Sequence, residues 1–431
     1  MWRMMTGLAL VLATAPAVAA APVAQETAQS DPAVHTRADS LIALLNDSGD
    51  YDASFSPAFR ADIPREKMEA ISAQLRAALG KAQRVETLTP RGAWAADVVV
   101  GHDRGTATFA LTLDPAPPHL IAGLRITGTA QREDSFARLE ADFRALPGQS
   151  GFSVMALGTG APTPVARYNA DADAPLGSAF KLWVLAEAAR QVAAGQRRWS
   201  DVITLGPRSL ASGVLHNWPK DAPVTLQTLA TLMISVSDNS ATDALMTTLG
   251  RDTVNAMVTR TGVTPGPRTL PLLTTREAIA MKADPTLSAA WGKADAAGRK
   301  RLLTANTGRF AVAALDASIF AGNPVAVDSV EWFASPDDMA RTLDWLRREG
   351  GPTARAILAV NPGAPAATAD GMAYLGFKGG SEPGVVTLNY LVQSRDGRWF
   401  AVTGNWHRSD AGVSEASFGI LMARALTLAA R

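Results

Sequence analysis

The sequence predicts an α/β protein of two units, a small α+β unit followed by a larger unit in which helices flank an antiparallel sheet. Three observations predict this class. The 431 residues are enough for two or three domains, and predicted helices precede a run of strands in the first third of the chain. In the remainder, two predicted strands at the start and three at the end enclose a long helical block. We therefore expect strands from both ends of the larger unit to share one sheet.

The composition excludes several classes of function. Hydrophobic residues make up 47% of the chain and the formal net charge is +1, which excludes a disordered chain and provides no basic surface for nucleic acid. The chain has no cysteine, which excludes disulfides, thiolate metal sites and cysteine nucleophiles. Its five histidines are scattered without an H-x-x-H pair, so we expect neither a metal nor a cofactor.

Residues 1–21 predict a secretory signal peptide. Arg3 precedes a short apolar run from Gly7 to Val18, and small residues follow up to Ala21. The run is shorter than the roughly 20 residues of a membrane span, which argues against an N-terminal membrane anchor. An exported chain without cysteine suits the bacterial periplasm, with no stable membrane insertion. Residues 22–34, rich in Ala, Pro and Gln, are expected to form a flexible leader.

The small α+β unit is expected over residues 35–130. Apolar spacing predicts helices over 35–45 and 65–79. Alternating patterns then predict strands over 83–89, 94–100, 106–113 and 119–129. These strands carry no nucleophile–base pair, phosphate loop or carboxylate cluster, so a binding or packing role is predicted.

The larger unit is expected over residues 131–431. A helix is predicted over 131–146, and helices dominate from 177 to about 345. A closing helix is predicted over 414–431. The predicted strands span 151–158, 164–169, 374–380, 385–394 and 399–406.

Three short motifs are candidates for catalysis. In Ser178-Ala179-Phe180-Lys181 the serine and lysine share one helix face, and a partly buried lysine can accept the proton of a serine nucleophile. In Ser237-Asp238-Asn239, between two predicted helices, a hydroxyl can relay a proton and an amide can bind a substrate carbonyl. In Lys378-Gly379-Gly380, at the end of a strand, a lysine can bind a carboxylate beside glycines that admit a substrate backbone.

Each motif taken alone also has a purely structural interpretation. Ser178 can be a helix N-cap with Lys181 solvated in the first turn. Residues 237–239 have the composition of a turn that starts a helix. Lys378 can be a charged residue that protects an edge strand from aggregation. The three motifs each occur once and in this order, and this joint occurrence favours the catalytic interpretation.

S-x-x-K, S-D-N and K-T-G in this order are the motifs of serine β-lactamases and penicillin-binding proteins, and residues 131–431 resemble a class A-type β-lactamase catalytic domain. The resemblance implies a three-layer, transpeptidase-like α/β fold. The preceding small domain, of a cystatin/NTF2-like kind, and the run from Phe377 to Gly384 resemble the two-domain β-lactamase-like proteins of clavulanic acid biosynthesis.

The resemblance also implies a role for each motif residue. Ser178 is expected to be the acylated nucleophile and Lys181 its general base, and Ser237 is expected to relay the proton to the leaving nitrogen. Asn239 and Lys378 are expected to bind the substrate amide and carboxylate. Gly379 and Gly380 are expected to let the substrate backbone lie against the strand. The backbone N–H groups of Ser178 and Ser381 are expected to form the oxyanion hole.

Two departures from the family pattern affect the expected activity. The third motif is K-G-G, so the hydroxyl that would contact a substrate carboxylate is missing. The stretch from Gly262 to Pro271 has no acid, where class A enzymes have a glutamate that activates the deacylating water. Glu277 is the nearest candidate, but Thr274 to Glu277 is typical of a capping box. We therefore expect long-lived acyl-enzymes with penicillins.

Three hypotheses follow for the function. The first is an exported serine hydrolase acting on β-lactam-type amides, weakly or with selectivity for cephalosporins or esters. The second is a D,D-peptidase-like esterase, and the third is a sensor that binds β-lactam or peptidoglycan without turnover. His216, Asn217 and Trp218 are expected either to border the cleft or to pack in a loop, and Asp337 and Asp338 are expected only to start a helix.

Overall fold

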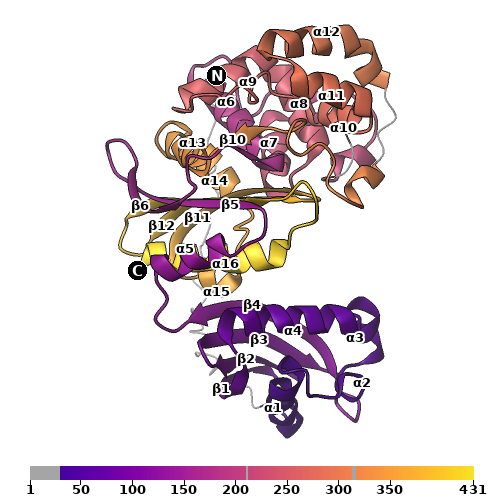
Figure 1. Ribbon diagram of the computed structural model, residues 1–431, viewed down its shortest axis with the longest axis vertical. Coiled ribbons are helices and arrows are strands. Elements are labelled where there is room, and N and C mark those ends of the chain that lie inside the picture. Colours follow the sequence, from indigo (N-terminus) through magenta and orange to yellow (C-terminus); the bar gives the residue numbers. More distant parts are fainter. Residues whose placement is uncertain (1–29, 210–211, 313–316) are drawn as a thin grey trace, which may run out of the picture.

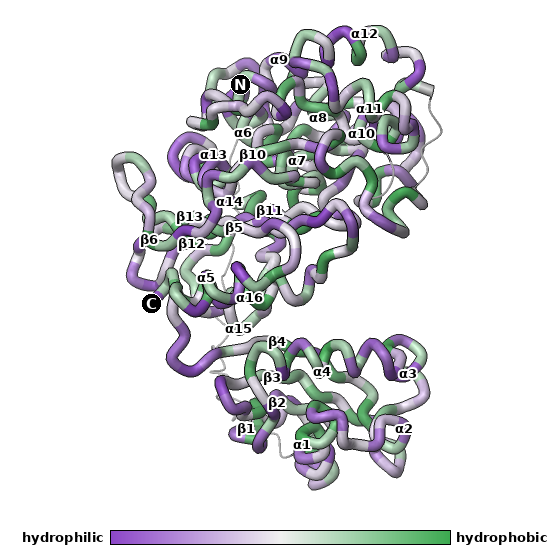
Figure 2. Tube along the Cα trace, in the orientation of Figure 1, coloured by the Kyte–Doolittle hydropathy of each residue, from purple (hydrophilic) through white to green (hydrophobic). Residues whose placement is uncertain are grey.

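Two separate units make up the chain in the computed structural model, which describes residues 30–209, 212–312 and 317–431 (Figure 1). The predicted signal peptide and most of the predicted leader lie outside the described residues. Hydrophobic stretches run along the strands and inward-facing helices, and the outer loops are mainly hydrophilic (Figure 2).

In the small unit, helices cover one face of a four-stranded antiparallel sheet of order β1-β2-β3-β4. Its buried core comes from α1, α4 and alternate residues of the strands. The predicted leader extends too far, because α1 begins at Pro32, with proline in its first turn and Asp31 as the N-cap. The elements are α1 (Pro32–Leu45), α2 (Tyr51–Ser54), α3 (Pro57–Asp62), α4 (Arg65–Leu79), β1 (Ala82–Gly92), β2 (Ala95–His102), β3 (Gly105–Leu113) and β4 (Ile121–Gln131).

The larger unit contains a five-stranded antiparallel sheet of order β11-β12-β13-β5-β6. Two of its strands precede the helical block and three follow it. The prediction that strands from both ends of the unit share one sheet is therefore confirmed. The strands are β5 (Gln149–Leu157), β6 (Thr163–Tyr168), β11 (Met372–Glu382), β12 (Val385–Ser394) and β13 (Trp399–His407).

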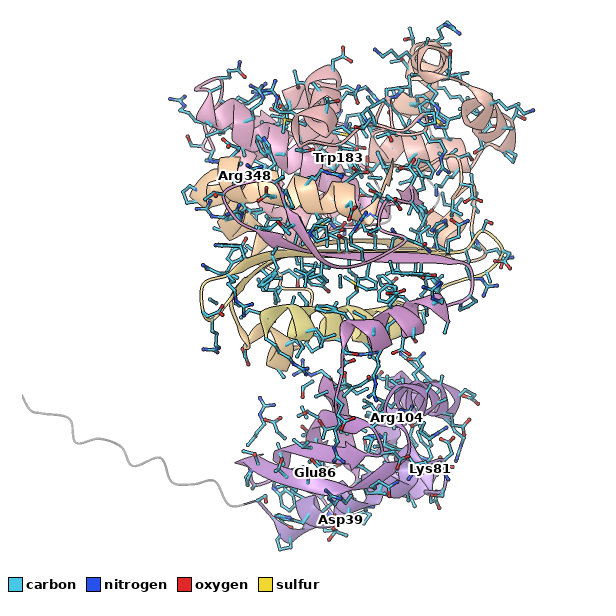
Figure 3. The ribbon with its side chains drawn as sticks, turned by 60° about the vertical axis from the view of Figure 1, so that its left-hand side comes forward. Asp39, Lys81, Glu86, Arg104, Trp183 and Arg348 are labelled. Carbon is cyan, nitrogen blue, oxygen red and sulfur yellow. The ribbon has the colours of Figure 1, made fainter. Side chains whose placement is uncertain are left out.

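Helices lie on both faces of this sheet and complete a three-layer arrangement (Figure 1). On one face, α5 (Phe136–Arg144) and α16 (Glu415–Ala430) cover an apolar core. On the other face lie α13 (Pro336–Glu349) and α14 (Gly351–Leu358), with the helices between residues 181 and 312 behind them. Trp183 lies inside this helical layer (Figure 3), fully buried, and its indole N–H donates to Thr342 Oγ1 at 3.0 Å.

The helical block contains the elements that position the candidate site. The helices are α6 (Lys181–Ala193), α7 (Leu226–Ser235), α8 (Asn239–Leu249), α9 (Arg251–Arg260), α10 (Thr275–Lys282), α11 (Pro285–Lys293) and α12 (Ala296–Val312). The short helix α15 (Ala366–Ala369) lies outside this block and contacts β4, β11 and α16. The 3-10 turns are η1 (Gly177–Phe180), η2 (Leu215–Asn217) and η3 (Ala317–Phe320). Short strands form two pairs, β7 (Ala174–Pro175) with β10 (Phe333–Ala334) and β8 (Val202–Thr204) with β9 (Pro223–Thr225).

A buried ion pair ties the segment between the two units to the last helix. Arg424 of α16 donates from Nε and Nη2 to Asp134 at 2.9 and 2.8 Å, and both side chains are 4% exposed. A second contact goes to Asp142 of α5. Breaking such a pair leaves a buried charge without compensation.

Arg424→Met is therefore expected to lower the free energy of unfolding of the larger unit by about 3 kcal/mol. Urea unfolding followed by tryptophan fluorescence measures the change. Arg398→Met, which removes an exposed pair with Asp396, is the matched control and should leave the transition unchanged. Equal transitions for both variants would contradict the assignment.

Candidate active site

Ser178 lies in the tight turn η1, between the short strand β7 and helix α6. Its side chain is half-buried and faces a cleft of about 850 Å³. The hydroxyl makes no hydrogen bond with any of the described residues, and neither η1 nor α6 has a side-chain N-cap. The N-cap interpretation of Ser178 is therefore wrong, and its hydroxyl is open to the cleft.

Lys181 is buried one turn after Ser178, with no exposed surface, so the alternative interpretation as a solvated lysine is wrong. Its Nζ donates to the backbone oxygen of Ser237 at 2.6 Å, to Ser237 Oγ at 3.1 Å and to Asn239 Oδ1 at 2.8 Å. Burial, and then the nearby charge of Lys378, hold the pKa of Lys181 well below its usual value. The neutral amine that a general base requires is thereby favoured.

The second motif forms the turn between α7 and α8. Ser237 has a φ of +57°, which lies in the left-handed region and is uncommon for serine. Asp238 is fully buried and serves as the N-cap of α8, accepting from Ala241 N at 2.8 Å and Val214 N at 2.6 Å. The turn interpretation therefore holds for Asp238, while Ser237 and Asn239 face Lys181 and the cleft.

Lys378 lies on the edge strand β11 but is only 3% exposed, so it does not protect that edge from solvent. Its Nζ donates to Ser237 Oγ at 3.1 Å and to the backbone oxygen of Gly379. Burial lowers the pKa of Lys378 to about 7. The Ser237 hydroxyl therefore bridges two buried lysines that are far apart in the sequence.

Strand β11 lies in close contact with the nucleophile turn. A Cβ atom at Gly380 would stand 2.2 Å from the oxygen of Leu176 and 2.5 Å from the nitrogen of Ser178. Gly177 has a φ of +48°, and a Cβ atom added at this residue would lie only 3.1 Å from Ser381 N. These contacts require glycine, and they bring the Ser178 and Ser381 amides, the expected oxyanion donors, to one wall of the cleft.

The structure thus brings together every residue that the three motifs predicted for the site. The cleft lining also includes residues of α7 and α10 and, after α12, Phe320, Ala321 and Gly322. His216, Asn217 and Trp218 are not among the residues that line the cleft.

Three buried charged residues in the cleft wall were missed by the motif search. Lys282 Nζ donates to Glu331 Oε1 at 3.0 Å and to Glu382 Oε1. The three side chains are at most 7% exposed, and all three residues line the cleft. The one available signal was Glu331 itself, a single acid between Val330 and Trp332, where burial requires a partner.

Glu277 lies away from this wall and has a structural role. Its carboxylate accepts from Thr274 N at 2.8 Å in a capping box and from Arg251 Nη2 at 2.6 Å. The predicted capping box is confirmed. Within the described parts of the chain, no three His, Asp or Glu residues are placed to hold a metal ion, and no helix has the length and hydropathy needed to cross a membrane.

A serine open to a cleft, a buried lysine one turn away and a second serine bridging two lysines define the class of serine hydrolases that act through an S-x-x-K motif. A model of the beta-lactamase enzyme family matches residues 132–349, about half of the chain. The chain belongs to this family, and the family resemblance is confirmed. The matched region ends before Lys378, so it includes the first two motifs alone.

Solved structures give three further comparisons. A beta-lactamase from Sphaerobacter thermophilus is 23% identical, covering 68% of this chain and 96% of its own, with a TM-score of 0.48. A protein described as PBP-A is 17% identical, with coverage of 68% and 93% and a TM-score of 0.44. A class A beta-lactamase from Bacteroides cellulosilyticus is 16% identical, with coverage of 68% and 94% and a TM-score of 0.47. No curated protein matches the chain.

Gly380→Ala is expected to reduce the rate of Ser178 acylation by about 100-fold or more, because the added methyl group forces β11 away from the oxyanion donors. The rate is measured with an activated ester or β-lactam by stopped-flow or mass spectrometry. Gly308→Ala, at a position where a Cβ atom meets nothing within 4 Å, is the control. A normal rate in Gly380→Ala would show that the close approach is not needed.

The pKa of Lys378 predicts a pH dependence for anionic substrates. Below about pH 7 the side chain carries a charge that attracts a substrate carboxylate, and above it the charge is lost. The second-order acylation rate with a carboxylate-bearing substrate should fall about 5- to 10-fold between pH 6 and 8, relative to an uncharged ester. Lys378→Arg keeps its charge and should remove this relative fall. Parallel profiles for both substrates would contradict the role of Lys378.

Proposed function

We propose that the protein is an exported serine hydrolase that forms an acyl-enzyme through Ser178 on β-lactam-type amides and related esters. The bridging of Lys181 and Lys378 by the Ser237 hydroxyl, at the edge of a cleft that Ser178 lines, carries this proposal. It supplies a proton path between a base and the leaving group. The signal-peptide pattern of residues 1–21 supports export to the periplasm.

The proposed acylation step assigns a role to each of these groups. Neutral Lys181 takes the proton of Ser178 as its oxygen attacks the substrate carbonyl carbon, and the oxyanion forms between the Ser178 and Ser381 amides. The C–N bond then breaks, and Ser237 passes a proton from the Lys181 ammonium to the leaving nitrogen. Asn239 holds the substrate amide and Lys378 attracts its carboxylate.

Deacylation lacks an evident buried carboxylate base that is free to activate water in the part of the cleft that the structure describes. Glu277 is held by Arg251 and the capping box. Glu331 and Glu382 are bound to Lys282. We therefore propose slow hydrolysis of the penicillin adduct and faster turnover of small esters or cephalosporin-type rings with good leaving groups. This observation also favours a second candidate, a sensor that keeps the adduct.

Intact-protein mass spectrometry after mixing with benzylpenicillin tests the acylation. One equivalent of adduct that persists for minutes or longer is expected with the wild-type protein, and no adduct with Ser178→Ala. Lys181→Ala should acylate about 10²- to 10⁴-fold more slowly, because the general base is removed. Ser40→Ala, in the small unit, should react as the wild type does.

A wild-type protein that never forms an adduct and hydrolyses neither esters nor cephalosporins would overturn the proposal. An adduct that forms equally in Ser178→Ala would place the nucleophile elsewhere. Rapid turnover of benzylpenicillin would contradict the inference that a carboxylate base for deacylation is absent.

A further inference from the structure

A buried cluster of Lys282, Glu331 and Glu382 lies directly beside the nucleophile turn. Lys282 is the last residue of α10, Glu331 precedes β10 and Glu382 ends β11. The cluster therefore joins three chain segments that share no local sequence relation. Lys282 donates to both carboxyl groups.

Each acid of the cluster is linked to one of the two expected oxyanion donors. Glu331 Oε2 accepts from Gly177 N at 3.0 Å, and Gly177 directly precedes Ser178. Glu382 directly follows Ser381 on β11. A bond through Lys282 connects the two acids, so the cluster forms a brace between the turn that carries one amide and the strand that carries the other.

The brace also fits the backbone that it holds. Gly177 adopts a φ of +48°, and its buried N–H would lack this acceptor without Glu331. Glu331 Oε2 also accepts from Trp332 N at 3.3 Å. Trp332 stacks on Phe180 of the same turn with ring centroids 3.9 Å apart. The segment around Glu331 thus contacts the nucleophile turn by a hydrogen bond and by ring packing.

The charges of the cluster are compatible with a nearby oxyanion. Burial, the charge of Glu331 and a hydrogen bond with Glu331 raise the pKa of Glu382 well above its usual value. Burial alone would lower the pKa of Lys282. The negative charges and hydrogen bonds of Glu331 and Glu382 have the larger effect, so the pKa of Lys282 is raised. Both shifts favour retention of protons on the cluster, which reduces the negative charge beside the oxyanion hole.

We propose that this cluster is a positioning device that sets the separation of the Ser178 and Ser381 amides and so controls stabilisation of the oxyanion. This inference rests on the proposed function, because it requires acylation at Ser178. The members of the cluster act through the backbone and touch no reacting atom. Loss of the brace therefore affects the rate of acylation more than substrate binding in the ground state.

The test compares Glu331→Ala with Glu331→Gln. Alanine removes the acceptor of the Gly177 N–H, whereas glutamine keeps an oxygen at that place. For Glu331→Ala we expect a 10- to 100-fold loss in the acylation rate constant, somewhat less than loss of an oxyanion donor outright, with a substrate dissociation constant within about 3-fold of wild type. Glu331→Gln should recover most of the rate.

A boronic acid that binds Ser178 provides a second readout. Its tetrahedral adduct places an oxygen between the two amides, so its affinity should fall with the acylation rate in Glu331→Ala and return in Glu331→Gln. Arg424→Met, which breaks another buried ion pair at a residue outside the cleft lining, is the matched control for stability. It should lower stability without changing the acylation rate of the folded protein.

If Glu331→Ala does not fold, Lys282→Met replaces it in the same two measurements. About a 10-fold loss in acylation rate and in boronate affinity is then expected. Wild-type rates in the cluster variants overturn the positioning role and leave the proposed function intact. A rate loss with unchanged boronate affinity also overturns it, since the loss then arises elsewhere. A wild-type protein that acquires no adduct at Ser178 overturns the proposed function and this inference with it.

Discussion

The burial of the Lys181 amine beneath the nucleophile is the constraint on which the rest of the site depends. A buried charged group is costly unless polar groups surround it, and a neutral amine still needs hydrogen-bond partners. The Ser237 backbone oxygen and Asn239 Oδ1 accept the two hydrogens of the neutral amine, and the Ser237 hydroxyl lies 3.1 Å from Nζ, where it can donate to the nitrogen. These groups are in place because the turn between α7 and α8 takes a left-handed backbone at Ser237, with Asp238 fixing the start of α8. The backbone conformation of the Ser237 turn is thus linked to the burial of the Lys181 amine.

The sheet places the third motif, on strand β11, next to the turn that carries Ser178. Because β11 pairs with β12, and β12 with β13 beside β5, residues near 380 reach the turn that follows β7. Gly380 and Gly177 leave room for this contact, and Lys378 reaches the Ser237 hydroxyl from the strand. A fold in which both ends of the unit share one sheet therefore places nucleophile, relay and carboxylate anchor in one cleft.

Sequence patterns predicted the features that depend on local spacing. Strand β12 spans the residues predicted, 385–394, because turn residues bound it on both sides, and the capping box at Thr274 was recognised from four residues. The predicted start of α1 was wrong, and the burial of Lys378 could not be decided from the sequence. Each depends on packing against distant segments. The Lys282, Glu331 and Glu382 cluster had no motif at all. Its members are 49 and 51 residues apart, and only the fold makes them neighbours.

The distribution of protons in the cleft connects these features with turnover. In the proposed acylation, Lys181 becomes neutral again once Ser237 has delivered the proton to the leaving nitrogen, so the site retains an amine with a lowered pKa. Of the carboxyl groups that line the cleft, Glu331 and Glu382 are occupied by Lys282, and Glu415 is exposed at the start of α16. For a water that attacks the proposed adduct, the Lys181 amine is then the remaining candidate base. Such a water reaches the ester carbon only where the departed group has left room, so the leaving group decides whether the protein behaves as a catalyst or as a trap.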